Sequence, residues 1–229
     1  DAIFDHSPPH ARVCQARCNC CTAGLCVIHL PMMPQHDLLH FRLLLRPLLP
    51  RVLLLVQNKQ GYLNLSELLA RGWTRNVQRD QAVLTWEWLQ ELNEGLIMLS
   101  GAAAGPVGQA LLAGDERRAA DVALQAAGVF VHRFFLELQR AGRPEDETLV
   151  QATVPLAARL GLPVVSTHPA QFLEPDDYEA HEARVCIAEG EILGNTRRVR
   201  RFTREQYLKN TAQMQALFAD VPTALSNTV

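Results

Sequence analysis

Small polar residues follow directly on a short apolar run in this 229-residue sequence. The run at residues 163–165 (PVV) carries no charge and is rich in β-branched side chains, which predicts a buried strand. Ser166, Thr167 and His168 come at its carboxyl end. Because α/β enzymes keep their ligands and chemistry at the carboxyl ends of parallel strands, this junction is the first candidate functional site.

Two neighbouring acids, Asp176 and Asp177, lie a few residues further on. Paired carboxylates are typical of a two-metal polymerase centre. These two follow Pro175 at the expected start of a helix near Tyr178, where acidic side chains cap free backbone amides. We therefore interpret them as a helix cap.

The first 50 residues form a cysteine- and histidine-rich segment that we leave unassigned. Five of the six cysteines lie between Cys14 and Cys26 in the spacing C-x3-C-x-C-C-x4-C, with His10 and His29 close by. Thiolates and imidazoles could hold zinc, although the paired C-x2-C arrangement is absent. A poorly ordered segment with exposed thiols, or a segment that is not the native amino terminus, explains the pattern equally well.

A basic run lies near the carboxyl terminus, at Arg197, Arg198, Arg200 and Arg201. Such a run could contact nucleic-acid phosphates, but a solvated basic loop is the favoured interpretation. The whole chain has 22 Lys and Arg against 24 Asp and Glu, a formal net charge of −2. No overall basic excess therefore indicates a nucleic-acid partner.

Four apolar runs of strand length alternate with helical periodicity from residue 51 onward. Strands are predicted at 52–56, 96–99, 134–138 and 163–166, and helices at 62–72, 107–112, 115–127, 145–160 and from 178. Strand-then-helix units at this spacing predict an α/β fold of parallel strands with right-handed crossovers. A capping box at 203–206 and Pro222 predict a helical carboxyl-terminal end.

The leucine-rich stretch at 38–56 contains Arg42, Arg46 and Arg51. Because each charge is costly at the centre of a bilayer, we expect no membrane span. The acidic start, with Asp1 and Asp5, does not match a signal peptide, and a cytoplasmic location is expected. The sequence does not begin with Met, so we expect a fragment.

Three long runs carry a resemblance to a known family: LELQRAGRP at 136–144, the segment at 160–192, and RFTREQYLKNTAQMQALFADVPTALSNTV at 201–229. They resemble the PHP (polymerase and histidinol phosphatase) domain of bacterial replicative DNA polymerase alpha subunits. The resemblance covers residues 51–229 and does not reach 1–50. It implies part of a distorted (β/α)7 barrel with a helical carboxyl-terminal end, truncated there.

The resemblance also implies a metal site at the third predicted strand. Metal-binding members have L-E-L-Q-D-H-G where this chain has residues 136–142, so Glu137 is kept while Arg140 and Ala141 replace an Asp and a His. We expect Glu137 to be a remnant of that site.

The fourth predicted strand departs from the family in the same way. Members have T-N-D-V-H where this chain has residues 167–171, so Pro169 and Gln171 replace an Asp and a His. His168 could be a relocated ligand or an ordinary loop histidine. With this many donors lost, no metal or other cofactor is expected for this chain, whereas the parent polymerase would use Mg²⁺.

An A-H-E run shared with the family holds His181 and Glu182, with Arg184 on the same predicted helix. These side chains either form a surface network or shape the former metal pocket. The resemblance implies a non-catalytic scaffold that supports the polymerase and docks its proofreading exonuclease, among other holoenzyme subunits and with DNA bound through the parent protein. The alternatives are a metal-dependent 3′–5′ exonuclease or phosphoesterase, and part of an error-prone alpha-type polymerase.

Overall fold

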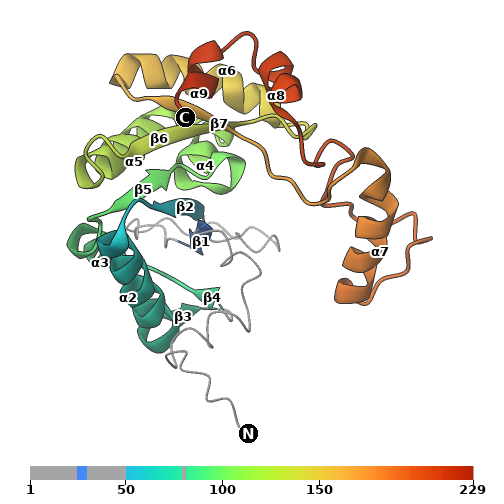
Figure 1. The fold of residues 1–229 in the computed structure, drawn as a ribbon, viewed down its shortest axis with the longest axis horizontal. Helices are drawn as coiled ribbons and strands as arrows, with labels where there is room; N and C mark the ends of the chain where they lie inside the picture. The colour runs from blue at the N-terminus through green and yellow to red at the C-terminus, as the bar shows by residue number, and fades with distance from the viewer. Residues whose placement is uncertain (1–24, 30–49, 79–80, 229) are drawn as a thin grey trace, which may run out of the picture. The chain divides into compact units, whose positions relative to one another are not determined.

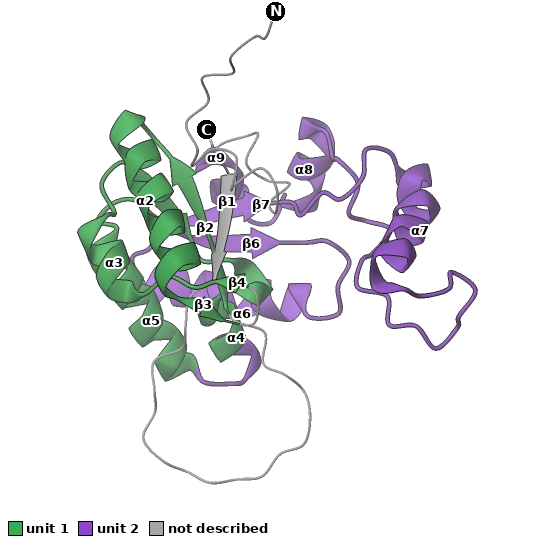
Figure 2. Ribbon diagram, turned by 90° about the horizontal axis from the view of Figure 1, so that it is seen from below, with its two compact units in different colours: residues 1–110, 116–134 green, residues 111–115, 135–229 purple. Residues whose placement is uncertain are grey.

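The computed structural model describes residues 25–29, 50–78 and 81–228. It divides into two compact units, one of residues 1–110 with 116–134 and the other of residues 111–115 with 135–229 (Figure 2). Helices and strands alternate through both units (Figure 1), so the predicted mixed α/β class is confirmed. The zinc hypothesis at Cys14–Cys26 lies outside the described side chains.

The first unit contains an antiparallel group of strands, not the parallel arrangement that the sequence predicts. Strand β2 (Arg51–Val56) pairs antiparallel with β1 (Leu25–His29) and with β5 (Leu96–Leu99). The connection from β2 to β5 explains the reversal, because it holds two helices and a hairpin instead of a single crossover helix. These are α2 (Lys59–Arg75), β3 (Val77–Gln78), β4 (Gln81–Ala82) and α3 (Trp86–Glu91). Strand β1 also lies in a segment where no strand was expected.

Helix α2 shows why a glycine in the sequence was mistaken for a helix end. Asn58 caps its start, where the side-chain oxygen accepts from the Gly61 amide at 2.9 Å. The predicted end at Gly72 is wrong, since the helix continues to Arg75. A Cβ atom at Gly72 would lie 3.1 Å from side-chain atoms of Ala82 and Leu84, so the glycine serves close packing.

The last two helices of the first unit follow the prediction closely, whereas α3 lies where no helix was predicted. After β5 come a short 3-10 turn (Ala102–Ala104), α4 (Pro106–Leu112), which ends in the second unit, and α5 (Glu116–Val129). The small residues Ala119, Ala123 and Ala126 form the buried stripe of α5, as their spacing predicts.

The second unit contains the parallel pair that the sequence predicts. Strand β6 (Phe134–Gln139) begins at the boundary between the units and pairs with β7 (Val164–Thr167), and α6 (Asp146–Leu160) connects them. Gly161 ends α6 with a left-handed φ of 64°, which confirms its expected role as the helix stop. Glu137 lies opposite Val165 and Gln139 opposite Thr167, so the polar side chains collect at one end of the pair.

The carboxyl-terminal helices differ from the prediction in how they are capped. A 3-10 turn (Pro175–Asp177) precedes α7 (Tyr178–Glu189), and Asp177 accepts from the Glu174 amide at 3.0 Å, so it caps the turn rather than α7. No helix begins at 203–206. Instead α8 (Thr211–Leu217) begins after Asn210, whose side chain and that of Gln213 form the capping box. The predicted final helix is α9 (Pro222–Ser226).

Residues 173–205 form an excursion from the end of β7, and α7 is its main element. The two ends of the excursion are held together by a bridge between Phe172 and Tyr207. Backbone hydrogen bonds from Gln171 to Gln206 (2.7 Å) and from Leu208 to Phe172 (2.9 Å) close its base. Figures 1 and 2 both show α7 standing apart from α6, α8 and α9.

Within the described ranges, no helix is both long and apolar enough to cross a membrane.

Candidate functional site

The ends of β6 and β7 place three polar side chains on one face of the second unit. The Gln139 amide donates to Glu137 Oε1 at 2.9 Å and to Thr167 Oγ1 at 3.0 Å, and the Thr167 hydroxyl also donates to Glu137 Oε1. Glu137 itself is buried. A buried carboxylate needs hydrogen-bond donors, and two neutral side chains supply them here.

His168 comes directly after β7, and both of its ring nitrogens are buried. Neither nitrogen makes a hydrogen bond of ordinary geometry in the part of the chain that the structure describes. Burial lowers the pKa of His168, and the charge of Lys209 lowers it further, whereas the nearby backbone of Glu205 and Tyr207 acts in the opposite direction. The neutral imidazole is therefore the favoured form.

Within the described residues, Glu137 and His168, which the sequence nominates as weak metal ligands, are not joined by a third potential ligand. Across residues 25–29, 50–78 and 81–228, no three His, Cys, Asp or Glu side chains are grouped closely enough to hold a metal ion. A tightly held divalent cation needs several convergent oxygen or nitrogen donors.

Arg140, which follows β6, joins three segments of the second unit. Its guanidinium lies 2.6 Å from Asp220, 3.1 Å from Glu147 and 2.7 Å from the Leu217 carbonyl oxygen. It also lies over the Phe218 ring, 5.2 Å from the centroid. The Arg140 hydrogen bond lowers the pKa of Asp220, and the same contact raises the pKa of Arg140. This residue therefore cross-links β6, α6 and the carboxyl-terminal helices.

Ala141, next to Arg140, is buried and connected through its backbone. Its amide donates to Asp146 Oδ2 at 2.6 Å, and its carbonyl accepts from the Thr203 hydroxyl. The Thr203 amide in turn donates to Gln206 Oε1 at 3.0 Å, so one half of the capping box predicted at 203–206 forms, although no helix follows it.

Helix α7 carries a second charged group, a buried ion pair. Glu182 and Arg198 pair through Oε2 and Nη2, and their side chains are only 1% and 3% exposed. Arg200 Nε lies 3.9 Å from the same carboxylate oxygen. Glu182 Oε1 and Arg198 Nε and Nη1 have no hydrogen-bond partner in the described part of the chain. The pair is thus desolvated and incompletely satisfied.

His181, beside this ion pair, lies in an aromatic pocket. Its ring is 4.7 Å from that of Phe202 and 5.5 Å from that of Phe172. His181 Nδ1 lies 3.2 Å from an Arg184 nitrogen. Burial lowers the pKa of His181 and the Arg184 charge adds to this, while Glu182 opposes it.

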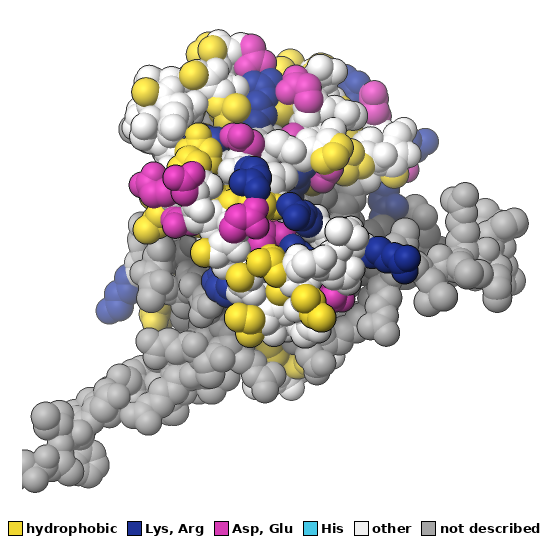
Figure 3. Space-filling model, turned by 90° about the vertical axis from the view of Figure 1, so that its right-hand side faces the viewer, with side chains coloured by type: hydrophobic (Ala, Val, Ile, Leu, Met, Phe, Trp, Pro, Cys, Tyr) yellow, Lys and Arg dark blue, Asp and Glu magenta, His cyan; other side chains and the backbone are white. Residues whose placement is uncertain are grey.

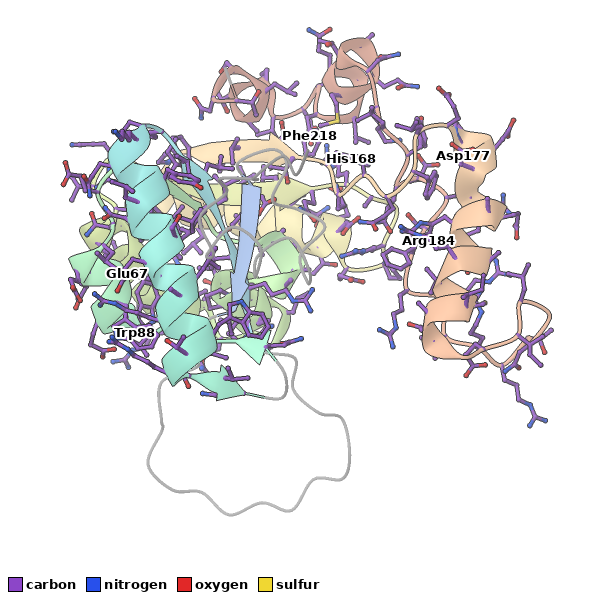
Figure 4. The ribbon with its side chains drawn as sticks, turned by 60° about the horizontal axis from the view of Figure 1, so that its bottom comes forward. Glu67, Trp88, His168, Asp177, Arg184 and Phe218 are labelled. Atoms are coloured by element: carbon purple, nitrogen blue, oxygen red, sulfur yellow. The ribbon has the colours of Figure 1, made fainter. Side chains whose placement is uncertain are left out.

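The predicted residues thus fall into separate places within the second unit. In Figure 4, His168 lies at the end of β7 and Arg184 on α7. Of the basic run, Arg198 is committed to Glu182, while Arg197, Arg200 and Arg201 are exposed. The metal, pocket and nucleic-acid roles of all these residues stay predictions.

Sequence reasoning missed the partners that hold these groups. Asp220 lies 80 residues from Arg140, and Thr203 lies 62 residues from Ala141, so no short-range pattern links either pair. Gln139 carried the one local signal, because it lies two residues from Glu137 and so on the same side of the strand.

Comparison with known proteins finds the same family as the resemblance, but the family match begins inside the segment 1–50, which the resemblance does not reach. The family model that matches is that of the PHP domain, over residues 29–141. The DNA polymerase III subunit alpha of Neisseria meningitidis serogroup A is 50% identical over 184 residues, 78% of this chain and 16% of that protein. The corresponding subunit of Pseudomonas fluorescens is 44% identical over 181 residues, which make up 79% of this chain and 15% of that protein. The corresponding subunit of Escherichia coli K12 is 40% identical over 181 residues, which make up 79% of this chain and 16% of that protein.

The chain therefore belongs to the PHP-domain family. Within that family it belongs with the PHP domain of the DNA polymerase III subunit alpha. It spans about 15% of the length of these relatives.

Proposed function

We propose that this chain acts in DNA replication as the PHP portion of a DNA polymerase III alpha subunit, where it is a non-catalytic scaffold in a distorted barrel. In this role it supports the polymerase and docks the proofreading exonuclease and other holoenzyme subunits in the cytoplasm. DNA and Mg²⁺ are bound by the parent protein.

The observation that carries this proposal is the use made of Arg140 and Ala141. Metal-binding PHP domains have an Asp and a His at these two positions. Here the guanidinium of Arg140 joins Glu147, Asp220 and the Leu217 carbonyl. A cation fixed at this place repels a second cation, and the Ala141 side chain has no donor atom. Both positions thus support cross-linking instead of metal binding.

The carboxyl-terminal helices add contacts typical of a scaffold. The Asn227 side chain donates to the Val164 carbonyl at 2.8 Å, and the Ser166 hydroxyl donates to the Ala224 carbonyl at 3.3 Å. Through these contacts α9 is fastened to β7, close to the strand ends. Buried hydrogen bonds of this kind hold the helices in one arrangement.

The proposal is tested on the full-length alpha subunit with its polymerase carboxylates inactivated. We expect far less than one equivalent of metal after exhaustive dialysis, and no metal-dependent 3′–5′ phosphodiester cleavage. Glu137→Gln tests whether this carboxylate binds metal, and Asp121→Asn, at an exposed acid on α5, is the matched control. About one equivalent of metal and a nuclease activity, both lost only in Glu137→Gln, would establish the metal-dependent exonuclease instead.

Docking is tested separately, by titrating the purified exonuclease subunit into the full-length alpha subunit. We expect saturable binding that Glu137→Gln leaves unchanged, because the scaffold does not use the remnant carboxylate. Absence of binding would remove the docking role.

A further inference from the structure

The buried His181 lies where the two ends of the excursion meet α7. Its ring packs against Phe172 at the outgoing end, with 5.5 Å between ring centroids, and against Phe202 on the returning segment, at 4.7 Å. Phe172 also forms the bridge to Tyr207 that closes the base of the excursion. One side chain of α7 therefore contacts both the outgoing and the returning chain, so it is placed to hold the helix in position.

The contact between His181 and Arg184 fixes which ring nitrogen carries the proton. His181 Nδ1 lies 3.2 Å from Arg184 Nη2. A guanidinium can only donate hydrogen bonds, so Nδ1 must accept and is therefore unprotonated. The neutral ring then carries its proton on Nε2, which is buried and has no hydrogen-bond partner in the part of the chain that the structure describes. The contact with Arg184 thus requires a neutral His181.

Protonation of His181 would make this contact unfavourable. The second proton is taken up at Nδ1, the acceptor atom, so two donors and two positive charges would face each other. The new charge would also lie in a pocket lined by aromatic rings, where water does not solvate it. Burial, the larger cause, and the Arg184 charge both lower the pKa of His181. The arrangement with α7 in place therefore resists protonation.

The other charged groups near His181 are paired with one another. Glu182 on α7 raises the pKa of His181, but its carboxylate already binds Arg198. Further arginines of the returning segment also have carboxylate partners: Arg200 with Glu182, Arg201 with Glu189 and Arg204 with Glu179. The Tyr178 hydroxyl donates to the Phe202 carbonyl at 3.3 Å. On the outgoing side, residues 170–173 carry no charged side chain. Arg184 is therefore the charge that a proton on His181 meets directly.

The long-range charge of the excursion does not keep His181 neutral. Residues 173–205 hold six arginines and eight acidic side chains, a formal charge of −2. Figure 3, which faces the α7 side of the molecule, shows basic and acidic side chains mixed over this face. Because negative surroundings favour a proton, the neutral state depends on the burial of His181 and on its contact with Arg184. The burial is lost if α7 moves away from Phe172 and Phe202, and the ring can then turn away from Arg184.

We propose that His181 is an acid-sensitive switch: the neutral ring holds α7 against Phe172 and Phe202, and its protonation by solvent releases α7. The bridge from Phe172 to Tyr207 and the backbone bonds beside it do not involve His181, so the release is confined to residues 173–205 and the strands beneath stay paired. His181 is a positioning residue in this device. The inference does not depend on the proposed function.

Hydrogen exchange of the full-length alpha subunit, measured by mass spectrometry from about pH 7.5 to about pH 5 and corrected for intrinsic exchange rates, tests the switch. A histidine with a lowered pKa holds the folded arrangement above about pH 6.5 and loses it as the pH falls. Exchange in α7 should therefore increase roughly tenfold or more below that pH, as expected for the loss of a hydrogen bond to a charged group. Exchange in α6 should stay unchanged. An equal increase in α6, or no increase in α7, would overturn the proposal.

Two variants separate the switch from a purely structural role. His181→Phe keeps an aromatic ring against Phe172 and Phe202 but cannot be protonated, so exchange in α7 should change less than about twofold with pH. Arg184→Gln, at an exposed position, keeps the histidine and removes the opposing cation, so the increase on acidification should be at least about threefold smaller than in the wild type. A wild-type response to pH in either variant would overturn the proposal.

His168→Gln is the matched control, because His168 is the other histidine of this unit whose pKa is lowered. This variant should keep the wild-type increase of exchange in α7 as the pH falls. Loss of the increase in His168→Gln would assign the pH response to His168 and overturn the proposal.

Discussion

Arg140 and Arg198 are both held by carboxylates, but in opposite surroundings. The carboxylates that hold Arg140, on Glu147 and Asp220, are 56% and 58% exposed, and its guanidinium also finds a carbonyl oxygen and an aromatic ring. Arg198 and Glu182 are almost wholly buried and leave three polar atoms without hydrogen bonds in the described part of the chain.

The difference shows that two ion pairs with similar distances have different consequences for stability. Exposed carboxylates are screened by water, so the contacts of Arg140 are individually weak and act mainly by joining segments. A buried pair has lost its hydration, so removal of one partner leaves an uncompensated charge in a poorly solvated place. Each prediction below separates these two situations.

The largest effect is expected for Glu182→Gln, which leaves Arg198 buried without its counter-charge. We expect a fall in Tm of roughly 10 °C, measured by circular dichroism. Glu179→Gln is the matched control on the same helix, because Glu179 pairs with Arg204 at an exposed site, and its Tm should change by less than about 2 °C. An equal fall in Tm in the two variants would show that the buried and the exposed ion pair contribute equally to stability.

Replacement of both partners sharpens the same contrast. In Glu182→Leu with Arg198→Met, no charge is left buried, so most of the lost Tm should return even though the ion pair is absent. If the double variant is as unstable as Glu182→Gln, the pair itself and not the isolated charge is what stabilises α7.

A smaller effect is expected for Arg140→Ala. Loss of the exposed ion pairs and of the packing on Phe218 should lower the free energy of unfolding by about 1–2 kcal/mol, measured by urea denaturation. Hydrogen exchange should increase mainly in α8 and α9. Arg140→Lys keeps the charge but not the planar guanidinium group. Its free energy of unfolding should therefore lie between those of the wild type and Arg140→Ala. Unchanged exchange in α8 and α9 would contradict the cross-linking role.

The pH dependence concerns His168, which is half-buried, and the buried His181 on α7. The pKa values of His168 and His181 are both lowered, chiefly by burial, so below about pH 6.5 the unfolded chain takes up protons that the folded chain resists. Stability should therefore be complete above that pH and fall as the pH drops toward 5. His168→Gln should flatten the profile of urea midpoint against pH, and an unchanged profile would show that His168 does not contribute.

The smallest effect is expected for the exposed arginines. Because Arg198 belongs to the buried pair, only Arg197, Arg200 and Arg201 are changed to Ser. DNA affinity of the full-length subunit at moderate salt should stay the same, measured by fluorescence anisotropy. A drop of tenfold or more would show that these residues contact phosphates after all.

The parts of the fold that the sequence predicted are those set by local pattern. The apolar runs of β2, β5, β6 and β7 and the small-residue stripe of α5 lie where periodicity places them. The direction of β5 could not be predicted in this way, because the intervening α3 and the β3–β4 hairpin show no strong period and reverse the chain.

The sequence nominates candidate residues, whose roles stay predictions, but not the contacts that they make. A family pattern points to Glu137 and Glu182, and His168 is nominated only by its place after β7. The contacts of Arg140 with Asp220, of Ala141 with Thr203 and of Glu182 with Arg198 join residues between 16 and 80 positions apart. Such contacts depend on tertiary packing, so they are invisible to any local rule.

The closed base of the excursion has a consequence for how this domain can change. Phe172 and Tyr207 are bridged and Gln171 bonds to Gln206, so the two ends of residues 173–205 are already side by side. A short connection could span that gap, so α7 can be shortened, lengthened or exchanged without breaking the pairing of the strands beneath it.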